Sequence, residues 1–135
     1  MAFDLATEER VLVAVLCHEW ARQTAAAVET YDFGDIRTST IWQAMRNLEA
    51  AGDPRLGTLD TLAAVHEHLV AQDARTGRHV ADAVSLAHLA DMTNRTENYP
   101  DVATFRADCQ WLRELAILRD TKRQHANGYA VARRA

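Results

Sequence analysis

Residues 102–118 read VATFRADCQWLRELAIL and have the clearest structural pattern of the chain. Its apolar residues recur three and four positions apart, which is the spacing of one face of an α-helix. They form two neighbouring stripes along the same helix. The first stripe consists of Val102, Phe105, Cys109, Leu112 and Ala116, and the second of Trp111, Leu115 and Leu118. One stripe can pack against its own domain. The second must be buried by something else, either a neighbouring helix of the same chain or a second subunit.

This helix is expected to be the longest of the chain. Pro100 suits its first turn, because proline lacks the N–H group that would be unpaired there. From Asp101 the pattern predicts a helix that extends to about Asn127. Residues 119–134 carry five basic side chains and a single acidic one. A solvated helix face explains this charge, and contact with nucleic acid or an acidic partner is the alternative.

The segments before this helix also have helical spacing. The expected helices run from Asp4 or Thr7 to Cys17, from Trp20 to Val28, from Thr38 or Ser39 to Leu48, from Thr58 to about Asp73, and from Val80 to Met92. The chain is 48% hydrophobic, with only 5 glycines and 2 prolines in 135 residues, and no stretch alternates as a strand would. The sequence therefore predicts one all-α domain over residues 1–135, a compact orthogonal bundle of about six helices ending in a long C-terminal helix.

Charge and cysteine usage narrow the class of protein. The net charge of −4 would repel the phosphates of a nucleic acid, so direct nucleic-acid binding is disfavoured except through residues 119–134. The two cysteines, Cys17 and Cys109, stand in no ligand or CxxC spacing, which favours a reduced, cytoplasmic protein. No apolar run approaches the roughly 20 residues of a membrane span, and residues 1–7 lack the features of a signal peptide.

Histidines and cysteines are the residues of this chain most suited to bind a metal ion or to act as a nucleophile or base. His66 and His68 lie two positions apart on a predicted helix, where their side chains point roughly 200° away from each other and cannot share a metal ion. Cys17 and His18 also diverge, and Cys17 is expected to be a small buried side chain. The glycine-rich and nucleophile motifs of nucleotide-binding and hydrolytic sites are missing. We therefore expect no catalytic residue, no metal and no cofactor, and a protein that is not an enzyme.

Residues 38–52, TSTIWQAMRNLEAAG, suggest an alternative. A polar start, a leucine and a glycine stop are typical of the recognition helix of a winged-helix transcriptional regulator. Such a fold needs two β-strands next, but residues 58–71 have helical spacing. Arg46 is the only basic residue of the supposed recognition helix, which weakens phosphate binding. A DNA-binding regulator is kept as the second hypothesis.

Several short motifs occur in an order that matches a known family. They are EERVLVAVL at 8–16, YDF at 31–33, IWQAMRNL at 41–48, GDP at 52–54, LDTL at 59–62, LAHLADMTN at 86–94 and WLRELAILR at 111–119. In this order and spacing, over residues 4–122, the chain resembles the N-terminal domain of the bacterial replicative DNA helicase DnaB. The family usually has glycines where this chain has Asp82 and Ala83. The sequence Thr93-Asn94-Arg95 also departs from the family's pattern.

The resemblance implies a scaffold that pairs with itself and presents a surface to primase or to a loader protein. Carried over to this sequence, the pairing role falls on Leu86, Leu89, Trp111, Leu112, Leu115 and Leu118. The alternative is that these residues are plain core. The family's second hairpin arm, linker helix and ATPase domain do not follow here, so a dimer or monomer is expected rather than a ring.

The resemblance leaves the biological role open. A start at Met1 and a basic helix at the end favour a stand-alone protein, and an excised helicase domain is the alternative. A stand-alone protein could act as a replisome adaptor. It could equally compete for helicase or primase surfaces and so block assembly.

Overall fold

The computed structural model describes the backbone of residues 3–134 and the side chains of residues 3–126. Within that range the chain forms α-helices and one short 3-10 helix, and no β-strand. The elements are α1 (Leu5–Cys17), α2 (Glu19–Thr24), η1 (Thr30–Asp32), α3 (Ile36–Ala50), α4 (Thr61–Thr76), α5 (Val80–Ala83), α6 (Leu86–Arg95) and α7 (Val102–Arg134). The predicted all-α fold with a long C-terminal helix is confirmed. No helix among the described residues is both long and apolar enough to cross a membrane.

Helix α1 is the centre of the molecule. It begins where the sequence predicts, because the Asp4 carboxylate accepts a hydrogen bond from the backbone N–H of Thr7 at 3.1 Å. Its apolar run from Val11 to Leu16 is buried all round. Helices α2, α3, α4, α6 and α7 all pack against it. A helix that is apolar on every side can only be stable in such a position.

Helix α3 starts earlier than the sequence predicts. Asp35, rather than Thr38 or Ser39, is the N-cap, and its side chain accepts from the backbone N–H of Arg37 at 2.8 Å. The prediction was wrong because it placed the start just before Ile41, the first residue of the apolar pattern. The actual first residue, Ile36, is exposed and therefore falls outside the apolar pattern.

Other helix boundaries also differ from the prediction, and α2, expected over residues 20–28, ends at Thr24. The helix expected over residues 80–92 is split into α5 and α6, because the Ser85 side chain accepts from the N–H of His88 and caps a new helix. Helix α4 begins at Thr61 instead of Thr58. The Thr58 hydroxyl donates back to the Arg55 carbonyl at 2.6 Å, which makes Thr58 part of the preceding turn.

The element that follows α3 also bears on the winged-helix alternative. A winged helix requires two β-strands after its recognition helix. Here α3 is followed by the 16-residue helix α4. Because no strand occurs in residues 3–134, the described chain does not have a winged-helix architecture.

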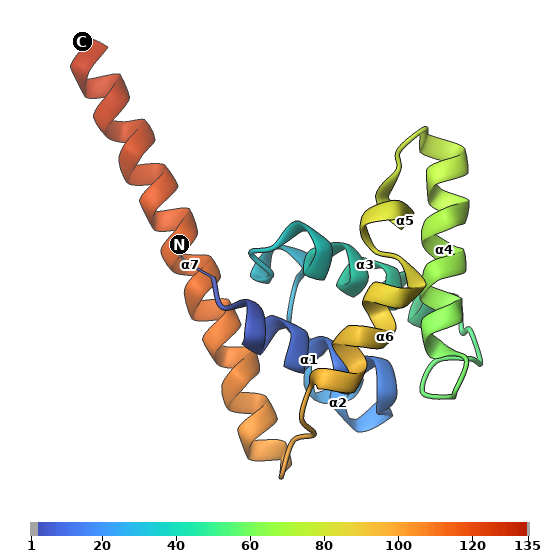
Figure 1. Ribbon diagram of the computed structural model, residues 1–135. Helices are drawn as coiled ribbons and strands as arrows, with labels where there is room; N and C mark the ends of the chain where they lie inside the picture. The colour runs from blue at the N-terminus through green and yellow to red at the C-terminus, as the bar shows by residue number, and fades with distance from the viewer. Residues whose placement is uncertain (1–2, 135) are drawn as a thin grey trace.

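Helix α7 runs along one side of the other helices and then projects beyond them (Figure 1). Its first half packs on α1, α2 and η1. Phe105 is the anchor, fully buried and edge-on to the rings of Trp20 and Tyr99 at 5.2 and 5.1 Å between ring centroids. Edge-to-face ring pairs of this kind add to the apolar burial. The predicted first stripe, apart from the exposed Val102, is thus the face that holds α7 to its own domain.

His68 makes the packing of α4 on α3 sensitive to pH. Its Nε2 lies 3.1 Å from Nδ2 of Asn47, and burial together with the nearby Arg75 lowers the pKa of His68 below its usual 6.5. Protonation is therefore less favourable in the folded state than in the unfolded chain. The free energy of unfolding should therefore decrease as the pH falls below about 6.5. Urea unfolding between pH 7.5 and 5 should show this decline.

Two variants test the assignment to His68. His68→Gln does not titrate and should lose less stability over this pH range than the native protein. His79→Gln removes a histidine whose side chain is 87% exposed, and it should behave as the native protein does. If His68→Gln and the native protein decline equally, another group is responsible.

Candidate protein interface

Helix α7 leaves part of its apolar surface uncovered. Trp111 and Leu118 are 44% and 47% exposed, and their spacing of seven residues places them on one side of the helix. Leu115 lies between them and is buried at its edge. We call Trp111, Leu115 and Leu118 the α7 flank. It corresponds to the second stripe of the sequence, and among the described residues no other helix covers Trp111 and Leu118.

The Trp111 ring is fixed by the start of α1. Its Nε1 donates a hydrogen bond to Oδ2 of Asp4 at 3.2 Å. Burial tends to raise the pKa of Asp4, but hydrogen bonds from Thr7 and from Trp111 lower it overall. A charged carboxylate thus holds the indole in place at neutral pH, while much of the ring remains open to solvent. A pre-positioned aromatic side chain is typical of the anchor residues of protein interfaces.

The other residues of the predicted interface lie elsewhere. Leu89 and Leu112 are fully buried, so both are core residues and neither can contact a second chain in this structure. Leu86 is exposed on α6, but α1 lies between α6 and α7 (Figure 1). The helical pattern identified apolar faces correctly but could not say which face is covered, because that depends on how α6 packs on α1 and α4.

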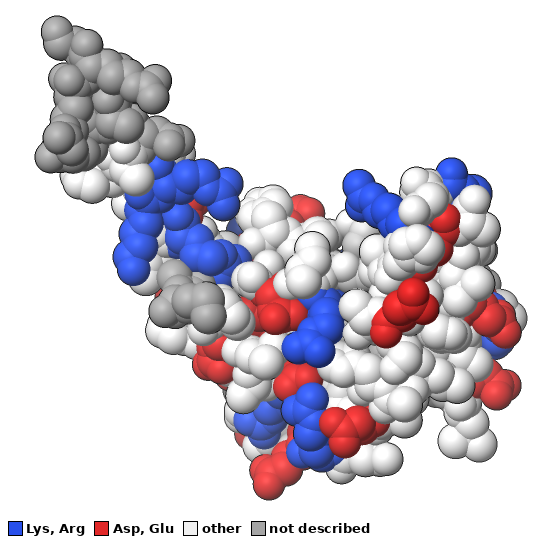
Figure 2. Space-filling model, turned by 45° about the horizontal axis from the view of Figure 1, so that its top comes forward, with Lys and Arg blue, Asp and Glu red and all other residues white. Residues whose placement is uncertain are grey.

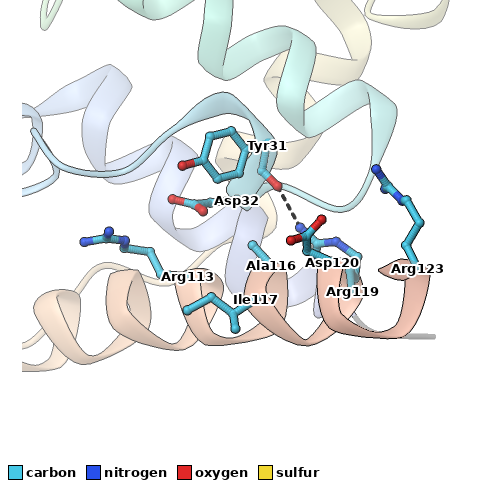
Figure 3. A pocket seen from close by; sticks show the side chains of 8 residues that line it. All are labelled: Tyr31, Asp32, Arg113, Ala116, Ile117, Arg119, Asp120 and Arg123. Carbon is cyan, nitrogen blue, oxygen red and sulfur yellow. Dashed lines mark hydrogen bonds between the residues drawn. The ribbon is translucent and has the colours of Figure 1, made fainter. Parts of the chain in front are cut away.

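Sequence reasoning missed a second feature, a cleft between η1 and α7 (Figure 3). Its volume is about 510 Å³. Its lining residues come from segments more than 80 positions apart and are Tyr31, Asp32, Arg113, Ala116, Ile117, Arg119, Asp120 and Arg123. The signal in the sequence was the acidic and aromatic motif YDF at 31–33. We call this site the η1–α7 cleft.

A hydrogen bond joins the two walls of the cleft. Nη2 of Arg119 donates to the backbone carbonyl of Tyr31 at 2.8 Å. The Asp32 carboxylate is buried beneath and accepts from the backbone N–H of Glu29 at 2.8 Å. Burial raises the pKa of Asp32, and the Glu29 hydrogen bond and the charge of Arg113 partly offset this. The polar groups of the floor are thus engaged within the domain.

Basic side chains gather on α7 where the helix leaves the body (Figure 2). Arg119, Lys122 and Arg123 belong to this part of the helix. The side chains of Arg133 and Arg134, which contributed to the predicted basic segment, lie outside the described residues. Over the body, on the face that Figure 2 shows, basic and acidic side chains are interspersed.

The residues considered for chemistry are dispersed. Cys17 is exposed at the end of α1, contrary to the expectation that it is buried, because the helix ends there and the chain turns into α2. Burial raises the pKa of Cys109 to about 12, which keeps this thiol protonated. His66 and His68 are not part of any group of three or more potential metal ligands among residues 3–126.

Comparisons with known proteins identify the fold. No protein-family model matches the chain, and no curated protein matches it either. Among solved structures, it is similar to the N-terminal domain of DnaB helicase from Mycobacterium tuberculosis, with a TM-score of 0.68 and 21% sequence identity. The alignment covers 97% of this chain and 84% of that one. The resemblance read from the sequence motifs is therefore confirmed at the level of the fold.

Proposed function

We propose that this chain, which has the fold of the DnaB N-terminal domain, is a non-catalytic protein-binding and oligomerisation domain of the DNA replication machinery. The observation that carries the proposal is a shared fold over 97% of the chain together with an uncovered apolar flank on its longest helix. Its activity is to assemble proteins through contact surfaces.

The α7 flank is the proposed self-association surface. It combines Trp111, the residue type most enriched among interface anchors, with Leu118 one heptad further along. Ala107, one turn before Trp111, is exposed and small, so a second helix can approach closely there. Charged residues such as Glu114 and Lys122 lie at the rim rather than in the centre. In a dimer with twofold symmetry the two flanks would cover each other.

A replicative helicase, a primase or a loader protein is the alternative occupant of the same flank. An adaptor would bind such a partner and add it to an assembly. A competitor would bind it and exclude another copy of the fold. In both cases the contact replaces the water that now covers Trp111 and Leu118.

Light scattering tests the proposal. The native protein should be a dimer, or should co-elute with the host's helicase or primase, and Trp111→Ala, Leu118→Ala should abolish that association. Loss of an anchor tryptophan costs about 2 kcal/mol or more, so the dissociation constant should rise by at least about tenfold. Leu118 is preferred to Leu115 for this variant, because Leu115 is buried and its loss would also destabilise the fold.

The matched control is Val70→Ala, which removes an exposed aliphatic side chain from α4, far from the flank. It should leave the association unchanged. A native protein that stays monomeric and binds neither helicase nor primase would contradict the assembly mechanism. A duplex-DNA titration would then test the basic residues 119–134, since phosphate contacts predict an affinity that falls steeply with salt.

A further inference from the structure

The η1–α7 cleft has arginines at both of its ends. Figure 3 shows Arg113 and Arg123 at opposite ends of a row of α7 residues, with Ile117 between them. Ten helical residues correspond to a distance of about 15 Å along the axis. This is the length of roughly four or five residues of extended chain. The cleft therefore matches a short extended peptide in length.

The two end arginines can donate hydrogen bonds to a ligand, although the charge of Arg113 also acts on Asp32. Neither Arg113 nor Arg123 donates a hydrogen bond to another described residue, whereas Arg119 is held by the Tyr31 carbonyl. Both side chains are exposed. An arginine guanidinium can bind a carboxylate through two parallel hydrogen bonds. The ends of the cleft thus suit acidic side chains.

The middle of the cleft is apolar above an acidic floor. Ile117 and Tyr31 are 66% and 72% exposed on opposite walls, and Ala116 leaves room between them. Asp32 and Asp120 are also in this central part. An anionic group would be repelled there, whereas an uncharged apolar side chain would cover Ile117 and the Tyr31 ring.

We propose that the η1–α7 cleft binds a short extended segment of a partner protein, with an acidic residue near each end and an apolar residue at its centre. Nucleic acid fits less well, because a strand carries a charge on every nucleotide and would place a phosphate beside Asp120. The proposal rests on the proposed protein-binding function but uses a surface separate from the α7 flank.

Fluorescence anisotropy with a labelled model peptide tests the proposal. The probe has blocked termini, a glutamate at each end and a leucine at its centre. In matched peptides, glutamine replaces both glutamates or alanine replaces the leucine. A short labelled single-stranded DNA is the competing probe. The acidic leucine peptide should bind best, and each replacement in the peptide should weaken binding.

Variants of the full chain locate the site. Arg113→Glu, Arg123→Glu should weaken binding of the acidic peptide by at least about tenfold, since two charge-assisted contacts become repulsive. Ile117→Ala should weaken it by about threefold, and this exposed position keeps the fold intact. The control Arg78→Glu, Arg106→Glu changes the net charge equally at exposed positions outside the cleft, so it should change affinity by less than about twofold.

Three results would overturn the proposal. They are absence of measurable peptide binding, equal losses in the cleft variant and its control, and tighter binding of the DNA than of the peptide. Circular dichroism confirms that each variant is folded. Failure of the self-association experiment alone would leave this result untouched, because Trp111 and Leu118 line no part of the cleft.

Discussion

Replacing Glu8 with alanine should lower the free energy of unfolding by about 3 to 5 kcal/mol. Glu8 is fully buried in α1. Its carboxylate accepts hydrogen bonds from the backbone N–H groups of Gly34 and Asp35, at 2.9 and 3.2 Å, and from the Thr38 hydroxyl. Alanine would remove the acceptor of both N–H groups and would leave the Thr38 hydroxyl with only the Asp35 carbonyl as its partner. Urea unfolding followed by circular dichroism measures the loss.

Two variants make the result specific. Glu8→Gln keeps one acceptor oxygen and should therefore lose less stability than Glu8→Ala. Glu114→Ala removes an exposed glutamate from the surface of α7 and should change stability by less than about 0.5 kcal/mol. A Glu8→Ala protein as stable as the native one would show that the donors find water instead. The link between α1 and the start of α3 would then carry little of the stability.

Replacing Phe105 with alanine should cost about 3 to 5 kcal/mol. The ring is fully buried and packs edge-on against Trp20 and Tyr99, so its truncation should leave a cavity. Because Phe105 anchors the first half of α7, the loss should also loosen the helix that carries both the α7 flank and one wall of the η1–α7 cleft. Chemical unfolding gives the first effect, and amide hydrogen exchange along α7 gives the second.

Val102→Ala provides the comparison for Phe105→Ala. Val102 is the first residue of α7 and is exposed, so its truncation should cost less than about 1 kcal/mol and leave exchange along the helix unchanged. A Phe105→Ala protein as stable as Val102→Ala would mean that α7 is held mainly by Leu112 and Ala116. The docking role assigned to the aromatic cluster would then be wrong.

The roles of Glu8 and Glu9 show a limit of sequence reasoning. Both stand in the first turn of a predicted helix, where negative charge interacts favourably with the helix dipole. The sequence indicates no further role for either residue. In the structure Glu8 binds the loop before α3. Glu9 forms an ion pair with Arg95 at the end of α6, with Oε2 and Nη2 2.6 Å apart. Partners 26 and 86 positions away leave no periodic signal in the chain.

Local physical chemistry in the sequence determined the helices themselves. The three-and-four spacing from Val102 to Leu118, the cap at Asp4 and the shortage of glycine and proline act within a few residues, so they predicted the all-α fold and its longest helix. The order of motifs also pointed to the fold shared with the DnaB N-terminal domain. All these signals are contained in the printed chain.

Only the tertiary structure decided which surfaces remain open. Leu112 and Trp111 are neighbours of equal apolar character, yet packing on α1 buries the first and leaves the second exposed. Likewise the η1–α7 cleft exists because Arg119 meets the Tyr31 carbonyl across 88 positions of chain. Burial and cleft formation depend on contacts between distant segments. Those contacts arise when the helices pack, and no single segment encodes them.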